Sequence, residues 1–178
     1  MGFKQVMQNR QLASIKPFVK MVKWNPRESS PRSVGLILYL EDMSELVLLK
    51  KVQTFFTKEG AECRTCIFKK NPKQHISEEW VDKSVVLIDQ KSVNWYGMIR
   101  PGYIESFVHE SFDLVINLSK NYFFTTAYVA SLAKASLKVG RYVWPLTSYH
   151  LVLGTGQSHN EDDFIHLLDS SLQFIRLE

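Results

Sequence analysis

A single stretch of the chain, residues 112–141 (FDLVINLSKNYFFTTAYVASLAKASLKVGR), limits the fold more than any other. It opens with an apolar run at 114–118, interrupted only by Asn117, as is typical of a strand that is covered on both faces. A polar turn follows, then a helical segment that we extend through Ala135, and then a short strand at 138–142. This order predicts a βαβ unit with two parallel strands.

The rest of the chain repeats this alternation of strands and helices. Further apolar runs predict strands at 34–40, 62–68 and 84–89, with a sixth strand or an edge extension at 150–153. Helices are predicted after Asp42, over 103–110 and after Asn160. We therefore expect a three-layer α/β/α domain around a mostly parallel sheet of about five strands, Rossmann-like or flavodoxin-like in its doubly wound order.

Two of these helices carry more detailed signals. Asp42 is the predicted N-cap of the first, and Glu45 follows three residues later in a capping-box pattern. The last helix carries an apolar stripe that we expect to be buried, consisting of Phe164, Leu167, Leu168, Leu172 and Ile175. Both helices are therefore predicted to pack on the sheet.

The positive charge of the chain is concentrated at its N-terminus. Residues 1–32 hold seven of the 22 Lys and Arg residues but one of the 18 Asp and Glu residues. Apolar residues recur there at a patchy helical spacing, and Pro26 and Pro31 end the pattern. We predict a basic helix and linker over 1–32, followed by one α/β domain over 33–178. The helix is expected to dock on the domain, and association with nucleic acid or a membrane surface is the alternative.

Cys63 and Cys66 form a CxxC pattern inside a predicted strand, where residues three apart point to opposite faces. Because no second Cys or His pair stands at ligand spacing, the pattern favours two reduced cysteines over a metal or redox site. We predict no metal and no cofactor. No stretch approaches the roughly 20 apolar residues that span a bilayer, and no leader pattern is present, so we expect a cytoplasmic protein.

Polar and aromatic residues that follow the predicted strands form the candidate binding site. The candidates are Asp89, Asn94, Trp95, Asn117, Ser119, Lys120 and Tyr122. Because parallel strands end at one edge of a sheet, where open α/β sheets bind ligands, we expect these residues to converge with Asp42. Each type also has a purely structural explanation as a helix cap, a solvated cation or a packed ring.

The chain lacks the motifs of the familiar catalytic and phosphate-binding classes, since it contains no GxGxxG, GxxxxGK[ST], HExxH or GxSxG. We therefore predict a Rossmann-like domain that binds a protein partner, a second copy of itself or a small anionic, nucleotide-like ligand, rather than an enzyme. The alternative is a glycosyl- or nucleotide-dependent transferase. In that alternative Ser119 and Lys120 would bind phosphate, Trp95 would stack on a ring, and Asp89 would bind a hydroxyl or act as a base.

The chain resembles an uncharacterised bacterial family of about this length. The resemblance covers nearly the whole chain, and its most specific parts are NWYG at 94–97, FDLVINLS at 112–119 and AKASLKVG at 133–140. It implies a cytosolic α/β protein without an assigned activity.

A shorter stretch is similar to the first lobe of heptosyltransferase-type glycosyltransferases of the GT-B fold. The similarity lies in DLVINLS at 113–119 and KVG at 138–140. Asn117 replaces an acidic residue of that pattern, and we expect no donor-sugar domain in 178 residues. The similarity therefore implies the fold of one lobe and not its activity.

Overall fold

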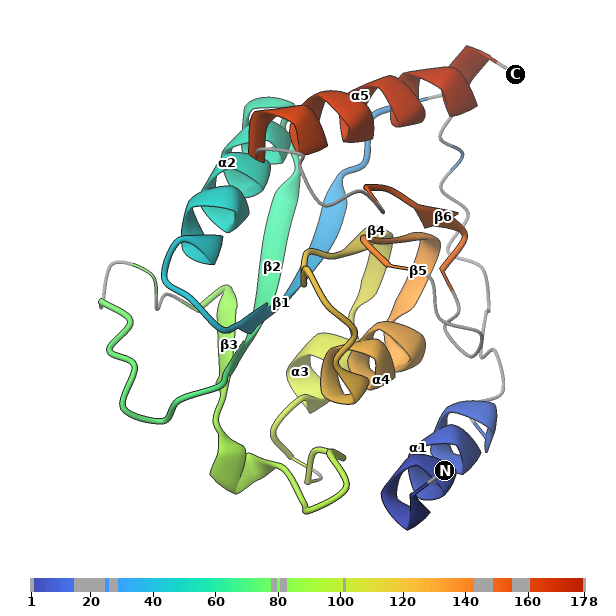
Figure 1. The fold of residues 1–178 in the computed structure, drawn as a ribbon. Coiled ribbons are helices and arrows are strands. Elements are labelled where there is room, and N and C mark those ends of the chain that lie inside the picture. The colour runs from blue at the N-terminus through green and yellow to red at the C-terminus, as the bar shows by residue number, and fades with distance from the viewer. Residues whose placement is uncertain are drawn as a thin grey trace.

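The centre of the molecule is a parallel sheet of six strands in the order β3-β2-β1-β4-β5-β6 (Figure 1). The computed structural model describes residues 2–14, 25, 29–77, 80, 83–100, 102–142, 149–154 and 161–177. The strands are β1 (Ser33–Leu40), β2 (Glu62–Lys69), β3 (Val85–Ile88), β4 (Ser111–Asn117), β5 (Lys134–Gly140) and β6 (Leu151–Val152). The predicted parallel α/β class is confirmed. The predicted number of strands was one too low, because the edge segment after Tyr149 pairs with β5 as a full sixth strand.

Five α-helices and one 3₁₀ helix connect or flank these strands in the described part of the chain. They are α1 (Phe3–Ser14), α2 (Glu45–Lys58), η2 (Gln90–Ser92), α3 (Glu105–Val108), α4 (Phe124–Leu132) and α5 (Glu161–Leu177). None of these helices is long and apolar enough to cross a bilayer.

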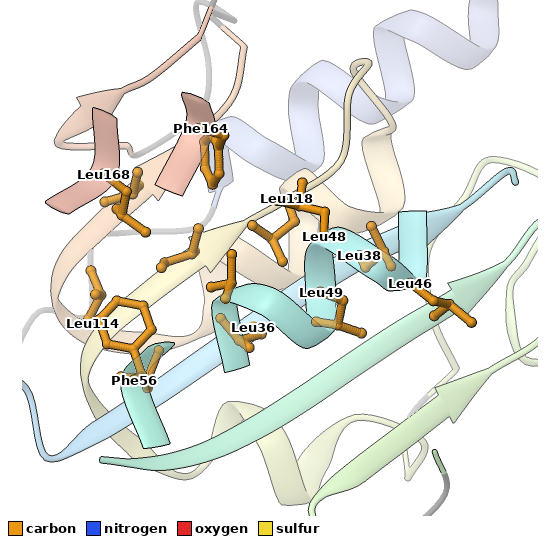
Figure 2. Close-up of a cluster of buried hydrophobic side chains, with 14 of the residues drawn as sticks. Leu36, Leu38, Leu46, Leu48, Leu49, Phe56, Leu114, Leu118, Phe164 and Leu168 are labelled. Carbon is orange, nitrogen blue, oxygen red and sulfur yellow. The ribbon is translucent and has the colours of Figure 1, made fainter. Parts of the chain in front are cut away.

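Two buried apolar clusters lie against the sheet, and β1 contributes to both. Leu36 and Leu38 belong to a cluster that also takes in α2 and α5, whereas Ile37 belongs to one shared with α3 and α4. This division follows from the strand period of two, which turns successive side chains to opposite faces. Figure 2 shows leucines of β1 and α2 meeting Phe164 and Leu168 of α5. Each fully buried side chain of this kind contributes about 2 kcal/mol to folding.

The two cysteines follow the same rule. Cys63 is half-buried and packs toward the α2 cluster, whereas Cys66 is fully buried in the α3 and α4 cluster. Both are free thiols, and burial raises the pKa of each. The predicted placement of this pair on opposite faces of the sheet is therefore confirmed.

The start of α2 differs from the prediction. The helix begins at Glu45 and not directly after Asp42, whose Oδ1 accepts a hydrogen bond from the Ser44 N–H at 2.8 Å. The Glu45 carboxylate does reach back, as expected of a capping box, and accepts the N–H groups of Glu41 at 2.8 Å and Asp42 at 3.4 Å. The carboxylates of Asp42 and Glu45 therefore hold the turn at 41–44 by accepting its backbone N–H groups.

The boundary between α4 and β5 is the largest correction to the predicted elements. The helix ends at Leu132, and Ala133 turns the chain into extended backbone with ψ 138°. Ala135 therefore belongs to β5, which spans Lys134–Gly140 rather than 138–142. Pairing of β5 with β4 outweighs the helix propensity of the alanines, because it satisfies the backbone groups of a whole strand.

Two further helices differ in detail. The helix expected over 103–110 is the single turn of α3, since Gly102 with φ +95° turns the chain just before it. In α5, Phe164, Leu168 and Leu172 are buried, but Leu167 is 39% exposed because it lies beside the buried stripe rather than within it. The predicted cap Asn160 and the second half of the predicted N-terminal helix lie outside the described residues.

Candidate functional site

A cavity of about 370 Å³ opens at the carboxyl ends of β1, β2 and β3. It is lined by residues of these strand ends, of the loop after β3, of α1 and of α4: Lys4, Tyr39, Phe68, Lys69, Ile88, Asp89, Gln90, Val93, Asn94, Trp95, Gly97 and Thr125. Three of the predicted site residues, Asp89, Asn94 and Trp95, are among them. The structure therefore brings these three predicted residues to one cavity at the strand ends.

The cavity has an apolar floor and an aromatic rim. Phe68 and Ile88 are almost completely buried at the ends of β2 and β3. Trp95 is 63% exposed, and its ring meets that of Tyr96 edge to face at 5.1 Å. An exposed indole beside an apolar floor is an arrangement that can bind a planar ring.

Asp89 caps the 3₁₀ helix η2. Its Oδ1 accepts hydrogen bonds from Lys91 N at 2.9 Å, Ser92 N at 3.1 Å and Ser92 Oγ at 3.1 Å. Partial desolvation raises the pKa of this carboxyl, but the hydrogen bonds from Ser92 and Lys91 outweigh it and leave the pKa below its ordinary value. Asp89 is therefore a carboxylate at neutral pH, and its Oδ2 is the oxygen available to a ligand.

Asn94 and Gly97 fix the loop that carries Trp95. The side chain of Asn94 accepts the N–H of Met98 at 2.9 Å, and its backbone N–H donates to the Met98 carbonyl at 2.8 Å. Gly97 has φ +96°, and a Cβ at this position would lie 2.9 Å from the ring of Phe124 in α4. The NWYG segment is therefore a closed turn pressed against α4.

Lysines from two distant parts of the chain line this cavity. Lys69 ends β2, and its Nζ donates to the carbonyls of Gln74 at 3.3 Å and Pro72 at 3.5 Å. Lys4 comes from α1, and neither lysine forms an ion pair with a carboxylate among the described residues. Lys69 could have been proposed from its place after a predicted strand. Nothing in the sequence indicates Lys4, because its position depends on how α1 docks.

The other predicted site residues lie at the end of β4 or directly after it, and they do not line the cavity. Asn117 is completely buried and donates to the hydroxyls of Tyr142 at 3.0 Å and Tyr149 at 2.7 Å. Ser119 is equally buried, and its Oγ accepts the Tyr39 N–H at 3.0 Å. These two polar groups bond to the protein itself.

Lys120 and Tyr122 are more accessible but belong to other surroundings. Lys120 is exposed, and its charge contributes to the lowered pKa values of Glu41 and Asp42, after the hydrogen bonds from Lys70 and Ser44. Tyr122 packs edge to face on Tyr142 at 5.7 Å, and burial raises its pKa to about 12. The predicted site residues therefore form two groups. Asp89, Asn94 and Trp95 line the cavity, whereas Asn117, Ser119, Lys120 and Tyr122 do not.

Tyr39 contacts both groups, since it lines the cavity and its N–H donates to Ser119 Oγ. Its ring lines the cavity and stacks on Phe123, with 3.8 Å between ring centroids and an interplanar angle of 9°. Phe123 follows β4 and immediately precedes α4. The stack therefore joins a cavity residue of β1 to the segment that follows β4.

The strand order reverses between β1 and β4, where doubly wound sheets place the phosphates of dinucleotides. The turn after β1 is Glu41-Asp42-Met43-Ser44, which contains two carboxylates and no glycine. The N–H groups of Glu41, Asp42 and Ser44 are taken by the Glu45 and Asp42 side chains, and Glu41 pairs with Lys70 at 2.9 Å. A phosphate here would meet like charge and occupied donors, so the turn is not a dinucleotide cradle.

The described residues contain no group of three or more His, Cys, Asp or Glu side chains that could hold a metal ion. Comparison with curated proteins and with solved structures finds no match for this chain. The sequence model of one family matches residues 8–175, which include the cavity loop, the β4 strand and most of α5. The chain therefore belongs to DUF6913, a family of unknown function.

Proposed function

We propose that this protein binds a small anionic ligand with a planar ring in the cavity at the ends of β1, β2 and β3. The observation that carries the proposal is the lining of that cavity, which places two lysines and an exposed tryptophan around an apolar floor. Lys4 and Lys69 would bind the anion, and each charge-assisted hydrogen bond contributes about 1.5–3 kcal/mol. Trp95 would stack on the ring, which is worth about 1–3 kcal/mol for a nucleobase.

Asp89 and Asn94 supply the polar contacts that select among such ligands. The Asp89 Oδ1 is already bonded to the loop, so its Oδ2 would accept from a ligand hydroxyl or amino group. The Asn94 Oδ1 is bonded to Met98, which leaves its amide N–H groups as donors. The preferred ligand therefore combines an anionic group with hydroxyl or amino groups, as a nucleoside monophosphate does.

Binding is better supported than group transfer. The transferase alternative needs Ser119 and Lys120 beside Asp89 and Trp95, but Ser119 and Lys120 do not line the cavity that the other two residues line. The similarity to a glycosyltransferase lobe rests on the β4 region, which does not line the cavity. The proposal is therefore a ligand-binding domain.

The arrangement of the layers and the location of the protein are also inferred. We infer a three-layer, Rossmann-like arrangement from the strand order and from the two helix pairs that share separate apolar clusters. We also infer a cytoplasmic location, which is supported by two free thiols in the described part of the chain.

Isothermal titration of the full chain with adenosine monophosphate, flavin mononucleotide and inorganic phosphate tests the proposal. We expect at least one probe to bind and Trp95→Ala to weaken binding of the ring-bearing probes about tenfold, or about 1.4 kcal/mol. Tyr103→Ala is the matched control, because Tyr103 is an exposed aromatic residue that does not line the cavity. Failure of all three probes to bind, or unchanged affinity in Trp95→Ala, would overturn the proposal.

A further inference from the structure

The helix α1 forms one wall of the cavity, although it lies far from the other walls in the sequence. Lys4 lines the cavity directly. One turn later, the Gln8 Nε2 donates to the Tyr96 carbonyl at 2.7 Å, across 88 residues of sequence. Gly97 lies close enough that a Cβ there would be 3.4 Å from the same Gln8 nitrogen. The helix is therefore bonded to the loop that carries Trp95.

The described side chains of α1 bury little apolar surface on the body. Among its side chains whose burial is described, Leu12 alone is buried, at 4% exposure, and Val6 is 37% exposed. The longer helix α5, by contrast, buries Phe164, Leu168 and Leu172 against the sheet. A short helix gains its stability mainly from the apolar face that it buries. Among the described side chains of α1, Leu12 and the Gln8 hydrogen bond are therefore the clearest attachments to the body.

We propose that α1 is a ligand-dependent wall, which an anionic ligand in the cavity holds against the body. This inference rests on the proposed function. Lys4 can contact the anion only while α1 is docked, so the ligand binds the docked state more tightly than the undocked state. Docking of α1 and binding of the ligand must then strengthen each other by the same factor.

Gln8 is the positioning residue in this scheme. It does not line the cavity, and it acts through the hydrogen bond that holds α1 to the Tyr96 carbonyl. Its removal should weaken ligand binding without removing any ligand contact. Gln5 lies on the same helix and serves as a matched control, because the hydrogen bond between α1 and the 94–97 loop in the described residues comes from Gln8.

Hydrogen exchange of the full chain, read by mass spectrometry with and without the three probes, tests the inference. Saturating adenosine monophosphate or flavin mononucleotide should slow exchange of the α1 amides at least about fivefold, the lower end of usual coupling between sites. The α5 amides should not respond. Gln8→Ala should speed α1 exchange in the free protein and raise the dissociation constant by a similar factor, whereas Gln5→Ala should do neither.

The outcomes separate this inference from the proposed function. Binding that depends on Trp95 without any change in α1 exchange would overturn the ligand-dependent wall and leave the binding site standing. Unchanged affinity in Gln8→Ala, despite faster α1 exchange, would overturn the coupling in the same way. If none of the three probes binds, both proposals fail together. Slower α1 exchange that Lys4→Ala abolishes would support the wall directly.

Discussion

The carboxyl edge of the sheet is open at β1 to β3 and filled at β4 to β5. On the first side, strand ends and the loop after β3 enclose a cavity of about 370 Å³. On the second side, Asn117 is enclosed by the hydroxyls of Tyr142 and Tyr149, and the Tyr149 ring lies against Gly140. Both sides obey the same strand-end rule. The difference shows that the rule locates polar residues, whereas side chains from later in the chain decide whether a ligand can reach them.

The largest expected effect on stability comes from replacing Asn117, which is buried at the filled side. Asn117→Ala removes two donated hydrogen bonds and the bond from the Ser119 N–H to Asn117 Oδ1 at 3.1 Å. Because all of these groups lie in or near the core, the free energy of unfolding should fall by about 3 kcal/mol. Urea denaturation measures this loss. Affinity for the probes should change little per folded molecule, since Asn117 does not line the cavity.

Asn121→Ala is the matched control for that variant. Asn121 is exposed and donates one hydrogen bond, to Glu41 at 3.2 Å. Its replacement should cost less than about 0.5 kcal/mol. Equal destabilisation by the two variants would show that Asn117 does not hold the filled side together.

The next effect concerns the loop on the open side. Gly97→Ala places a methyl group 2.9 Å from Phe124 at a φ of +96°, so we expect about 2–3 kcal/mol of destabilisation and weaker probe binding. Gly102→Ala has a similar φ of +95° but nothing within 4 Å of the new Cβ. Gly102→Ala should therefore cost about 1 kcal/mol. The difference between the two variants in thermal unfolding measures the contribution of the close contact between the loop and α4. A smaller loss in Gly97→Ala than in Gly102→Ala would contradict this packing.

The smallest expected effect is a pH dependence of the free energy of unfolding that arises from Lys138, in the half of the sheet that contains β4 and β5. Lys138 of β5 is buried, donates from Nζ to the Ser131 carbonyl at 3.0 Å, and has its pKa lowered by burial from 10.5 to about 8. The folded state therefore binds fewer protons than the unfolded state between these values, so stability rises with pH there. We expect a gain of about 1–2 kcal/mol from pH 7.5 to pH 9.5 in urea denaturation.

Lys138→Met identifies the source of that gain. Methionine keeps the length of the side chain but cannot titrate, so the rise in stability should disappear. The window ends near pH 10, because burial first and then Tyr142 raise the pKa of Tyr149 in the fold and reverse the slope when tyrosines ionise. A rise of equal size in Lys138→Met would assign the effect to another group.

The sequence predicted the elements of the core more reliably than it predicted their ends. Apolar runs placed the strands, because burial on both faces demands them. The end of α4 was misplaced, since Ala133 and Ala135 favour a helix locally and enter β5 only through pairing with β4. The predicted start of α2 was too early, because residues 41–44 form a turn in which the Glu45 and Asp42 carboxylates accept backbone N–H groups.

For the candidate site, the sequence determined which residues stand at the carboxyl ends of the strands, and the structure places Asp89, Asn94 and Trp95 of that set along one cavity. Tertiary structure alone decided that Asn117 and Ser119 are enclosed, that Tyr39 stacks on Phe123, and that Lys4 faces the cavity. The physical reason is that strand position depends on local periodicity. Access to a site, by contrast, depends on contacts between segments far apart in the chain, such as α1 and the 94–97 loop, which no local pattern records.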